Sequence, residues 1–557
     1  MLPLQIQSLG ELFSFSLILK FTLVALINTI FMCIVSLKFF QAVQQCGYKG
    51  AEYYKWIFAK ENSKLTRLAM LSLLSVLGFM LTNMAFAFIT NPIAHYLGFI
   101  WYFVFFTIYI VGEKKKKSKV PMVMTRRMIR LMATFVVITI IFNLLIIYGV
   151  NLLALLAKDA LIMNFRYAVI CLCPIVVPYL ILLAYLINNP YEKYSSNKHL
   201  QKATKTLDDF KGIKIAITGS YAKTSCKEIL ATILSEKYSV LATPKSFNTP
   251  LGISKTAKRL NDNYNVFIAE MGARHNGDIK QLCQIVKPNI GVITGITSQH
   301  LETFFSINNI KKAKYELVES IGEGHMVFSS DNTHTVEMYN SCKSSKVLAG
   351  LTIENAPLVY AENIEYSLQG TTFTLCYKDE KIKCSTKLVG ENACHNIVLA
   401  VAVATRLGLT LTEIAVGISK IEQVKHRLEV IKNEVGAYII DDSYNSNPEG
   451  VKRAIEVLKL VKGKKYVVTP GMIELGIFEN QENYNFGKQL ASVADKVLLI
   501  KRGGTLSIRE GLLSQGYDKN NIIMIKSLEE SKKFLQENLT NDDGVLFEND
   551  LPDLYNE

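Results

Sequence analysis

The chain has 557 residues, half of them hydrophobic and a fifth charged, and its 62 Lys and Arg residues outnumber its 48 Asp and Glu residues. This length exceeds one ordinary domain, so at least two are expected, and the hydrophobic content excludes a disordered chain. Residues 1–190 hold 17 basic and 5 acidic residues, whereas the remainder is nearly neutral. Because the basic excess belongs to the apolar third, the charge predicts no nucleic-acid partner.

Five apolar stretches in the first third are long enough to cross a bilayer, which takes about 20 helical residues. They cover residues 21–40, 68–90, 93–111, 131–157 and 167–188. We therefore predict an α-helical membrane domain of about five spans over residues 1–190, in contact with membrane lipid.

The orientation of this domain is predicted from its loops. Lys and Arg gather after the first and the third stretch, whereas the other loops carry few charges. Since loops rich in Lys and Arg stay in the cytoplasm, we expect a multi-pass protein of the cell membrane with its N-terminus outside. Everything after residue 190 is then cytoplasmic. Polar residues inside the stretches, such as Asn143 and Asn151, favour hydrogen bonds between helices over a substrate path.

From about residue 211, short β-branched runs alternate with amphipathic helical stretches, which is typical of α/β domains with mostly parallel sheets. The predicted strands cover residues 214–218, 266–270, 290–294, 438–442, 465–469, 496–500, 521–525 and 544–548. Residues 359–387 alternate more like antiparallel strands. A break near residues 408–412 separates a domain over 211–410 from one over 411–557, and residues 191–210 are predicted to be a polar linker.

The segment Thr-Gly-Ser-Tyr-Ala-Lys-Thr-Ser at residues 218–225 lies between a predicted strand and a predicted helix. That setting suits a phosphate-binding loop, since backbone N–H groups and a helix N-terminus would face the anion. Lys223 would reach the outer phosphates, and the Thr224 hydroxyl would hold Mg²⁺. Ile217 and Ala222 stand where the general pattern has glycine, so an ordinary strand–helix turn is the alternative interpretation.

Three further residues follow in an order that strengthens this signal. Glu270 ends a predicted strand, where an acid can reach a metal beside the phosphates. His300 and Lys314 come later in the same domain. Taken singly, a histidine here is more often structural and a lysine in a helix more often lies on a solvated face.

The order of these motifs resembles the Mur ligase family, most closely its branch of UDP-N-acetylmuramoyl-tripeptide–D-alanyl-D-alanine ligases. The resemblance runs from about residue 211 to the end. It is carried by the segments at residues 218–228, 247–252, 270–273, 300–302, 313–316, 395–396, 426–428, 441–448 and 472–476. It implies a central P-loop ATPase domain over residues 211–410 and a Rossmann-like C-terminal domain over residues 411–557.

The resemblance also implies ATP and Mg²⁺ as cofactors: ATP phosphorylates a carboxylate, and an amine attacks the acyl phosphate to form an amide. The catalytic positions match Lys223, His300 and Lys314, the last of which matches a lysine that becomes carbamylated. The implied metal ligands are Thr224, Glu270, His300 and Lys314, and the implied acceptor-binding residues are Asn248 and Thr249. The implied ATP contacts are Gly219, Ser220, Ala222, Lys223, Thr224, Ser225, Asn396, Arg427, Asp442 and Asn445.

Four departures from the family pattern bear on function. Ala222 replaces the glycine before the catalytic lysine, where a positive φ would be costly and a Cβ could crowd the phosphates. Leu399 replaces an asparagine expected near the adenine, and Pro470-Gly471 replaces a Gly-Asp pair. The membrane stretches stand where soluble members have a domain that holds the UDP end of the acceptor.

We therefore expect a membrane-bound, ATP-dependent amide ligase. It would join an amino acid or dipeptide amine to a carboxylate of a cell-envelope precursor, either lipid-linked or nucleotide-linked, with the lipid-linked form favoured. Three alternatives stay open: muramoyl-tripeptide–D-Ala-D-Ala ligation itself, membrane-associated poly-amino-acid synthesis, and a catalytically silent scaffold.

Overall fold

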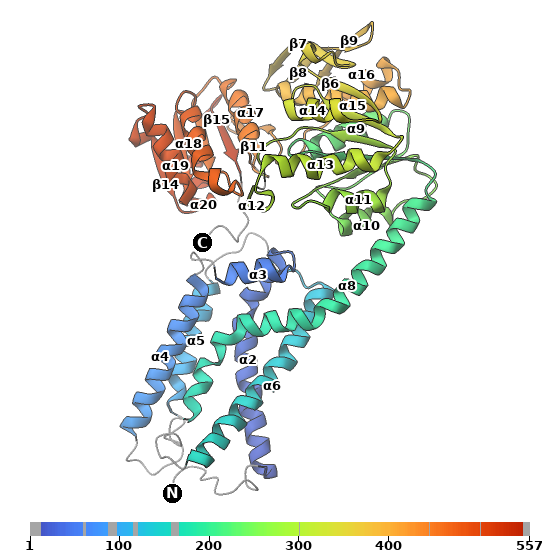
Figure 1. The fold of residues 1–557 in the computed structure, drawn as a ribbon. Helices are drawn as coiled ribbons and strands as arrows, with labels where there is room; N and C mark the ends of the chain where they lie inside the picture. Colours follow the sequence, from blue (N-terminus) through green and yellow to red (C-terminus); the bar gives the residue numbers. More distant parts are fainter. Residues whose placement is uncertain are drawn as a thin grey trace. The chain divides into compact units, whose positions relative to one another are not determined.

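The computed structural model describes residues 13–58, 63–86, 97–114, 121–157, 166–299, 301–444, 446–501 and 503–549 (Figure 1). The chain forms two compact units, which meet in the sequence between Ser195 and Ser196. The described part of the first unit is helical, and the second unit contains two β-sheets with covering helices.

The first unit is a bundle of apolar helices. They are α2 (Phe15–Gln45), α3 (Gly50–Ile57), α4 (Ser63–Ala85), α5 (Phe99–Lys114), α6 (Arg126–Ala157), the 3₁₀ helix η2 (Arg166–Val176) and α8 (Val177–Asp209). Within the described residues, four helical stretches are long and apolar enough to cross a membrane: Phe15–Gln45, Lys64–Ala85, Arg126–Ala157 and Arg166–Asp209. The predicted helical region is confirmed, but α5, in the third predicted span, has only 16 residues in the described part.

A polar network lies inside this bundle. Asn28 donates a hydrogen bond to the Asn143 side-chain oxygen over 2.8 Å, and Asn143 donates to the Thr29 hydroxyl over 2.9 Å. The Tyr102 hydroxyl donates to Asn28 over 2.5 Å. Asn151 accepts a hydrogen bond of 3.0 Å from Arg166. These side chains join α2, α5, α6 and η2, so the interpretation of Asn143 and Asn151 as bonds between helices is confirmed.

The predicted linker at residues 191–210 is helical, because α8 continues to Asp209. Ala203 and Leu207 on its last turns are buried in a hydrophobic core of the second unit, and Leu200 packs against the same core. These three residues are spaced three and four positions apart, which puts them on one face of a helix. Their burial explains why this polar segment keeps its helical form.

A nine-stranded sheet forms the centre of the middle domain. Its order is β2 (Val240–Ala242), β3 (Val266–Glu270), β1 (Ile213–Thr218), β4 (Ile290–Ile293), β5 (His325–Ser329), β6 (Ser345–Gly350), β7 (Val359–Ser367), β8 (Gly370–Tyr377) and β9 (Glu380–Thr386). The strands from β2 to β7 are parallel, and β7, β8 and β9 pair antiparallel. The predicted antiparallel segment therefore exists and extends this sheet.

Helices cover both faces of the sheet, as expected for buried parallel strands. They are α9 (Lys223–Leu234), α10 (Pro250–Ala257), α11 (Asp278–Val286), α12 (Leu301–Phe304), α13 (Ile307–Ile321), α14 (Thr333–Ser341), η3 (Ile353–Asn355), α15 (Glu391–Arg406) and α16 (Leu411–Ser419). One core lies under α9, α15 and α16, and the other lies under α10, α11 and α13. Because Leu411, Ile414 and Ile418 belong to the first core, we propose that the middle domain ends beyond the expected boundary at residue 410.

A six-stranded sheet follows. Its order is β10 (Glu429–Lys432), β11 (Tyr438–Asp442), β15 (Gly544–Glu548), β12 (Lys465–Thr469), β13 (Lys496–Ile500) and β14 (Ile522–Ile525), and only β10 is antiparallel to its neighbour. Its helices are α17 (Pro448–Lys459), η4 (Gly476–Phe478), α18 (Glu479–Leu490), α19 (Gly503–Ser514), η5 (Lys519–Asn521) and α20 (Leu528–Asn538). The last strand, β15, lies between β11 and β12, which places the ends of β11 and β15 side by side.

Candidate functional site

The loop after β1 is fixed to the loop after β4. The Ser220 N–H donates to the Gly295 carbonyl over 2.7 Å, and the Thr294 hydroxyl donates to the Tyr221 carbonyl over 2.5 Å. Gly219 has a φ of +152°, and a Cβ there would lie 2.1 Å from the Thr294 hydroxyl oxygen. Glycine is therefore required at this point, and the backbone forms a close-fitting turn of the kind that can hold a phosphate.

Ala222 stands at the N-cap of α9 with a φ of +62°. The sequence left open whether this alanine could avoid the left-handed region, and it does not. A residue with a Cβ costs about 1–2 kcal/mol in this conformation, and glycine does not carry that cost. The departure at Ala222 therefore places backbone strain at the start of the helix that would face the phosphates.

Lys223 and Thr224 begin α9, directly after this loop. The Lys223 ammonium donates to the carbonyls of Gly219 over 2.7 Å and of Ser220 over 3.1 Å. Loss of solvent lowers the pKa of Lys223 to about 8, against the opposing effect of the Glu270 carboxylate. Thr224 is buried beside it. A lysine and a hydroxyl at a helix N-terminus form a fitting set of donors and ligands for phosphate groups with their cation.

Glu270 ends β3, next to β1, and is buried at the same edge of the sheet. It accepts a hydrogen bond of 3.1 Å from Asn248, and its second oxygen lies 3.5 Å from the Lys227 ammonium. Lys227 is fully buried and also donates to the Lys245 carbonyl. Lys227 was not predicted as a site residue, although a buried carboxylate needs a counter-charge and Lys227 lies one helical turn beyond Lys223.

Thr249 has a structural part in this region. Its hydroxyl accepts a hydrogen bond of 3.3 Å from the Gly252 N–H and so caps α10. Asn248, in contrast, is directed at Glu270. Of the two residues expected to bind the acceptor, Asn248 is therefore the one that contacts the group of charged side chains.

Lys314 is buried on α13, where only 3% of its surface is exposed. Burial and the nearby Lys223 ammonium lower its pKa well below the ordinary value, although Asp278 and Glu316 oppose that shift. An uncharged amine is the form of lysine that reacts with CO₂, so this environment fits the carbamylation implied by the resemblance. His300 lies outside the described residues.

The described residues supply oxygen ligands suited to Mg²⁺, namely the Thr224 hydroxyl and the Glu270 carboxylate. Among them, no three His, Cys, Asp or Glu side chains come close enough together to hold a metal ion. The described residues thus offer few ligands for Mg²⁺, and a carbamate on Lys314 would add anionic oxygen ligands.

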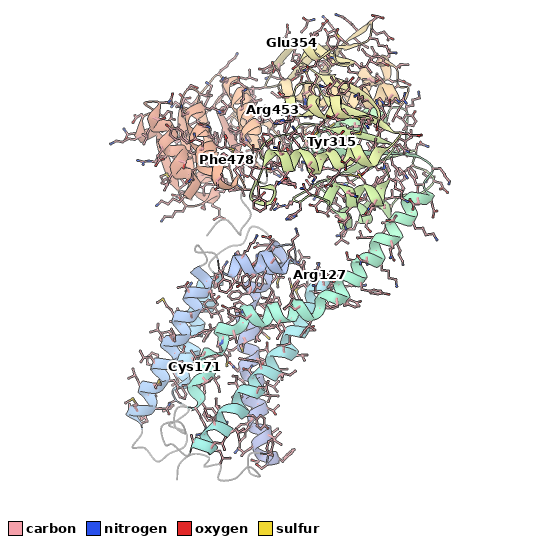
Figure 2. All side chains as sticks on the ribbon, viewed as in Figure 1. Arg127, Cys171, Tyr315, Glu354, Arg453 and Phe478 are labelled. Carbon is pink, nitrogen blue, oxygen red and sulfur yellow. The ribbon has the colours of Figure 1, made fainter. Side chains whose placement is uncertain are left out.

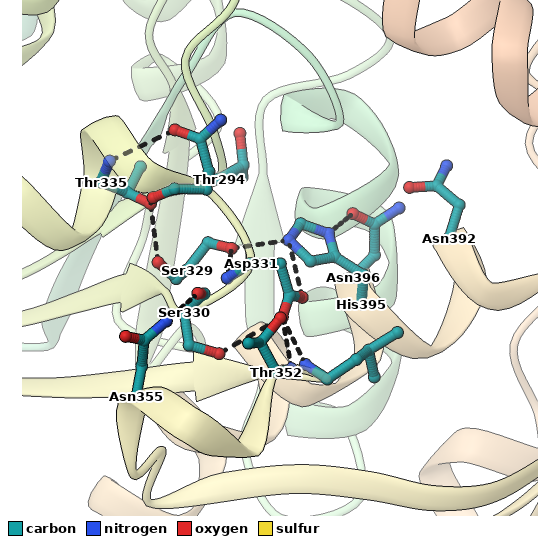
Figure 3. Close-up of polar contacts among 12 residues, drawn as sticks. Thr294, Ser329, Ser330, Asp331, Thr335, Thr352, Asn355, Asn392, His395 and Asn396 are labelled. Carbon is teal, nitrogen blue, oxygen red and sulfur yellow. Dashed lines mark hydrogen bonds and ion pairs between the residues drawn. The ribbon is translucent and has the colours of Figure 1, made fainter.

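A cavity of about 260 Å³ opens beside α15. His395, which lines this cavity, lies 2.9 Å from the Ser329 hydroxyl and 3.6 Å from the Asp331 carboxylate, and Figure 3 shows these contacts. Burial lowers the pKa of His395 to about 4, despite the attraction of Asp331. The cavity is lined by Asp331, Leu351, Thr352, Tyr366, Val389, Gly390, Glu391, Asn392, His395, Leu428, Arg453, Glu456 and Val457.

Side chains from the C-terminal domain complete this cavity. Arg453, labelled in Figure 2, donates to Asn392 over 2.6 Å and lies 4.7 Å above the ring of Tyr221 from the phosphate-type loop. Asn396 lies next to His395, 3.4 Å from its ring. Leu399 is instead fully buried in the hydrophobic core. Asp331 and Arg453 were not predicted from the sequence, since the only motif recognised in this region was the pair His395-Asn396.

Arg427 and Asp442 lie together in the C-terminal domain. The Arg427 guanidinium stacks 3.9 Å above the Tyr444 ring, and its attraction for Asp442 partly offsets the desolvation that lowers its pKa. Burial raises the pKa of Asp442 to about 6, although the Leu428 N–H donates to it over 3.1 Å. Asn445 lies outside the described residues.

Glu548 ends β15 in register with Asp442 and is fully buried. One of its oxygens accepts a hydrogen bond of 2.6 Å from Ser446, and the other has no partner among the described residues. Burial and the Asp442 carboxylate raise the pKa of Glu548 well above its usual value. This carboxyl pair was not foreseen, because it requires the return of β15 to a place beside β11.

Two family profiles match the second unit. The Mur ligase middle domain matches residues 217–404, and the Mur ligase, glutamate ligase domain matches residues 426–548. The fold and its phosphate-type loop thus define the class of two-domain ligases with an ATPase core. The chain belongs to the Mur ligase family, whose members are ATP-dependent and form C–N bonds.

Individual relatives agree with this assignment. The UDP-N-acetylmuramoyl-tripeptide–D-alanyl-D-alanine ligase of Haemophilus influenzae is 31% identical over 267 residues, covering 47% of this chain and 58% of that ligase. The Escherichia coli ligase of the same name is 30% identical over 312 residues, covering 56% and 69%. The crystal structure of MurF from Acinetobacter baumannii has a TM-score of 0.58 and 26% identity, covering 64% of this chain and 77% of that chain.

The matches therefore leave part of each protein uncompared. This chain spans little more than half the length of the Haemophilus influenzae ligase. The profile matches begin at residue 217, beyond the helical first unit.

We predict that Ala222→Gly stabilises the protein by about 1 kcal/mol, because it removes the cost of a left-handed alanine. Ala231→Gly, in the middle of the same helix, is the matched control and should destabilise by about as much. Thermal unfolding of the full-length protein in detergent measures both. Equal destabilisation by the two substitutions would show that Ala222 is not strained.

We predict that Glu548→Gln raises the melting temperature by a margin that grows with pH. A carboxyl whose pKa is raised by folding gives stability that is complete below its unfolded pKa of about 4.3 and is lost as pH rises through the folded pKa. Glutamine stays neutral, so the gain should reach about 2–4 °C at alkaline pH. The exposed Glu354→Gln serves as control. A gain that is constant with pH would contradict this account.

Proposed function

We propose that this protein is an ATP-dependent ligase that joins a carboxylate to an amine through an acyl phosphate. The observation that carries the proposal is the meeting of Lys223, Thr224, Glu270 and Lys314 at one edge of the middle-domain sheet. A lysine ammonium and a hydroxyl at a helix N-terminus, beside a carboxylate that can hold a cation, favour a nucleoside triphosphate with its Mg²⁺. The names of the curated relatives support the same chemistry.

In the proposed reaction, an acceptor carboxylate oxygen attacks the γ-phosphorus of ATP, and the bond to ADP breaks. The amine nitrogen then attacks the carbonyl carbon, phosphate leaves with the bonding electron pair, and the nitrogen loses a proton. Lys223 would offset the charge that develops on the transferred phosphoryl group. Mg²⁺, held by Thr224, Glu270, His300 and Lys314, would supply further charge neutralisation.

We propose that Lys314 is carbamylated in the active protein. Burial and the nearby Lys223 ammonium lower the pKa of Lys314 and so favour its neutral amine, which would attack CO₂ and form an anionic carbamate with loss of a proton. The new negative charge would then lie near Lys223, whose ammonium it would attract. Carbamylation would thus replace a side chain that repels the Lys223 ammonium when protonated with one that attracts it.

The nucleoside part of ATP would occupy the cavity beside α15. Asn396 and His395 offer hydrogen-bonding groups there, and Tyr221 joins the cavity to the phosphate-type loop. Arg427, Asp442 and Asn445 would close over ATP from the C-terminal domain. The burial of Leu399 supports a reduced role for this position in adenine recognition.

We further propose that the protein is anchored in the cell membrane and takes a lipid-linked carboxylate acceptor. Four helical stretches of the described chain have the length and composition of membrane spans, and the last runs without interruption into the second unit. An acceptor presented at the bilayer is within reach of such an enzyme. The names of the relatives favour the alternative of a UDP-linked muramoyl tripeptide with D-alanyl-D-alanine as the amine.

The ligase proposal predicts amine-dependent phosphate release by the full-length protein in detergent. The probes are ATP, Mg²⁺, a mixture of amino acids and D-alanyl-D-alanine, and an extract of envelope precursors. Lys223→Ala and Lys314→Ala should each lower the rate at least about 10²-fold. The first removes the cation that offsets charge on the phosphoryl group, and the second removes the proposed carbamate that would hold Mg²⁺. The exposed Lys312→Ala is the control on the same helix as Lys314. A folded protein that releases no phosphate with any mixture would favour the silent scaffold.

The topology proposal predicts which cysteines a membrane-impermeant maleimide reaches in intact cells. Phe13→Cys, before α2, should react from outside. Val123→Cys, in the basic loop before α6, should react only after permeabilisation, because Lys and Arg keep that loop in the cytoplasm. Exposure of Val123→Cys to the reagent in intact cells would reverse the orientation.

A further inference from the structure

Three large apolar side chains stand in solvent on two loops of the second unit. Phe305 is 81% exposed, Ile477 is 91% exposed, and Phe478, labelled in Figure 2, is 49% exposed. Phe305 directly follows α12, while Ile477 and Phe478 lie in η4, and these two helices are in contact. We call Phe305, Ile477 and Phe478 the loop patch. Single exposed apolar residues are ordinary, but a cluster marks a surface that another apolar phase covers.

Besides its exposed side chain, Phe305 has an unfavourable backbone conformation. Its φ is +63°, in the left-handed region that bulky residues rarely adopt. Such a conformation is unfavourable and is found most often at functional sites. Burial within the described part of the protein does not offset this unfavourable conformation, because most of the Phe305 ring faces solvent. A contact of the ring with something outside the chain would offset both the conformation and the exposure.

The loop patch borders the catalytic edge of the sheet. Arg274, just after β3 and Glu270, forms an ion pair of 3.2 Å with Glu474, in the loop that leads to η4. This ion pair ties the loop that carries Ile477 to the strand end that carries Glu270.

We infer that the loop patch inserts into the boundary between headgroups and hydrocarbon of the membrane that the first unit crosses. The helical stretch Arg166–Asp209 ends shortly before β1, so the chain itself tethers the second unit to the proposed membrane domain. Loop-borne Phe and Ile side chains beside an exposed Arg274 have the mixed character of interfacial anchors. The inference rests on the proposed membrane anchorage and is independent of catalysis.

The test uses the full-length protein in lipid nanodiscs, with cysteine variants labelled by an environment-sensitive fluorophore. Phe305→Cys and Ile477→Cys probe the loop patch. Ile353→Cys, in η3 and 58% exposed, is the matched control for an apolar side chain in solvent. Leu145→Cys, in α6 and 68% exposed, is the control for a membrane position. The quencher is a nitroxide carried on the lipid chains, and labelled unsubstituted protein gives the background.

At positions 305 and 477, the emission maximum of the fluorophore should shift to the blue, because hydrocarbon surrounds the label. Its emission should also be quenched at least about twofold more than at position 353, because the quencher is carried in the same hydrocarbon. Quenching equal to that at position 353 would overturn the inference, and so would a blue shift without quenching, which would indicate a protein partner. If position 145 is not quenched either, the proposed anchorage has failed instead. Phosphate release is measured separately, so failure of the ligase proposal stays distinguishable.

Discussion

The crowding of three lysines at one edge of the middle-domain sheet is the constraint around which the second unit is organised. Lys227 and Lys314 are buried, and Lys223 lies close to them with Glu270 as the buried counter-charge. An unpaired buried ion costs several kcal/mol. The protein lowers this cost in three ways: Lys227 pairs with Glu270, Lys223 bonds to loop carbonyls, and Lys314 has a low pKa. A bound anion with several negative charges would offset the remaining cost of the buried positive charge.

The backbone around this charge cluster is fixed in a way that suits such an anion. Gly219 fits against Thr294 where no side chain would, and Ala222 accepts a left-handed conformation to start α9 at Lys223. Tyr221 of the same loop lies against Arg453 and His395, which both line the cavity. The proposed nucleotide site therefore joins the loop, the charge cluster and the cavity.

Much of this architecture was predictable from the sequence, because buried parallel strands appear as short β-branched runs. The strands ending at Thr218 and Glu270 were placed almost to the residue, whereas the helix predicted to follow residue 225 begins earlier, at Lys223. The helix over the expected linker was missed, since Leu200, Ala203 and Leu207 are too sparse among polar residues to signal burial. The place of α16 in the core under α9 and α15 could not be read from the sequence either, because which core a short helix joins depends on tertiary packing.

Site residues were predicted where a local motif carried them and missed where distant strands bring them together. Glu548 meets Asp442 only because β15 returns between β11 and β12, and Arg453 reaches Tyr221 from another domain. Lys227 was within a recognised segment, but its burial against Glu270 is a property of the folded sheet edge. Charged residues that pair from distant parts of the chain give no recognisable pattern in a single sequence.

The central claim is that the acceptor carboxylate is presented at the membrane. Mass spectrometry of lipid-linked envelope precursors, from cells with the protein and from cells that carry Lys223→Ala, tests it most directly. The account predicts that one lipid-linked species loses an amide-linked amino acid or dipeptide in the variant, while its unmodified carboxylate form accumulates. A change confined to soluble, UDP-linked precursors would contradict it.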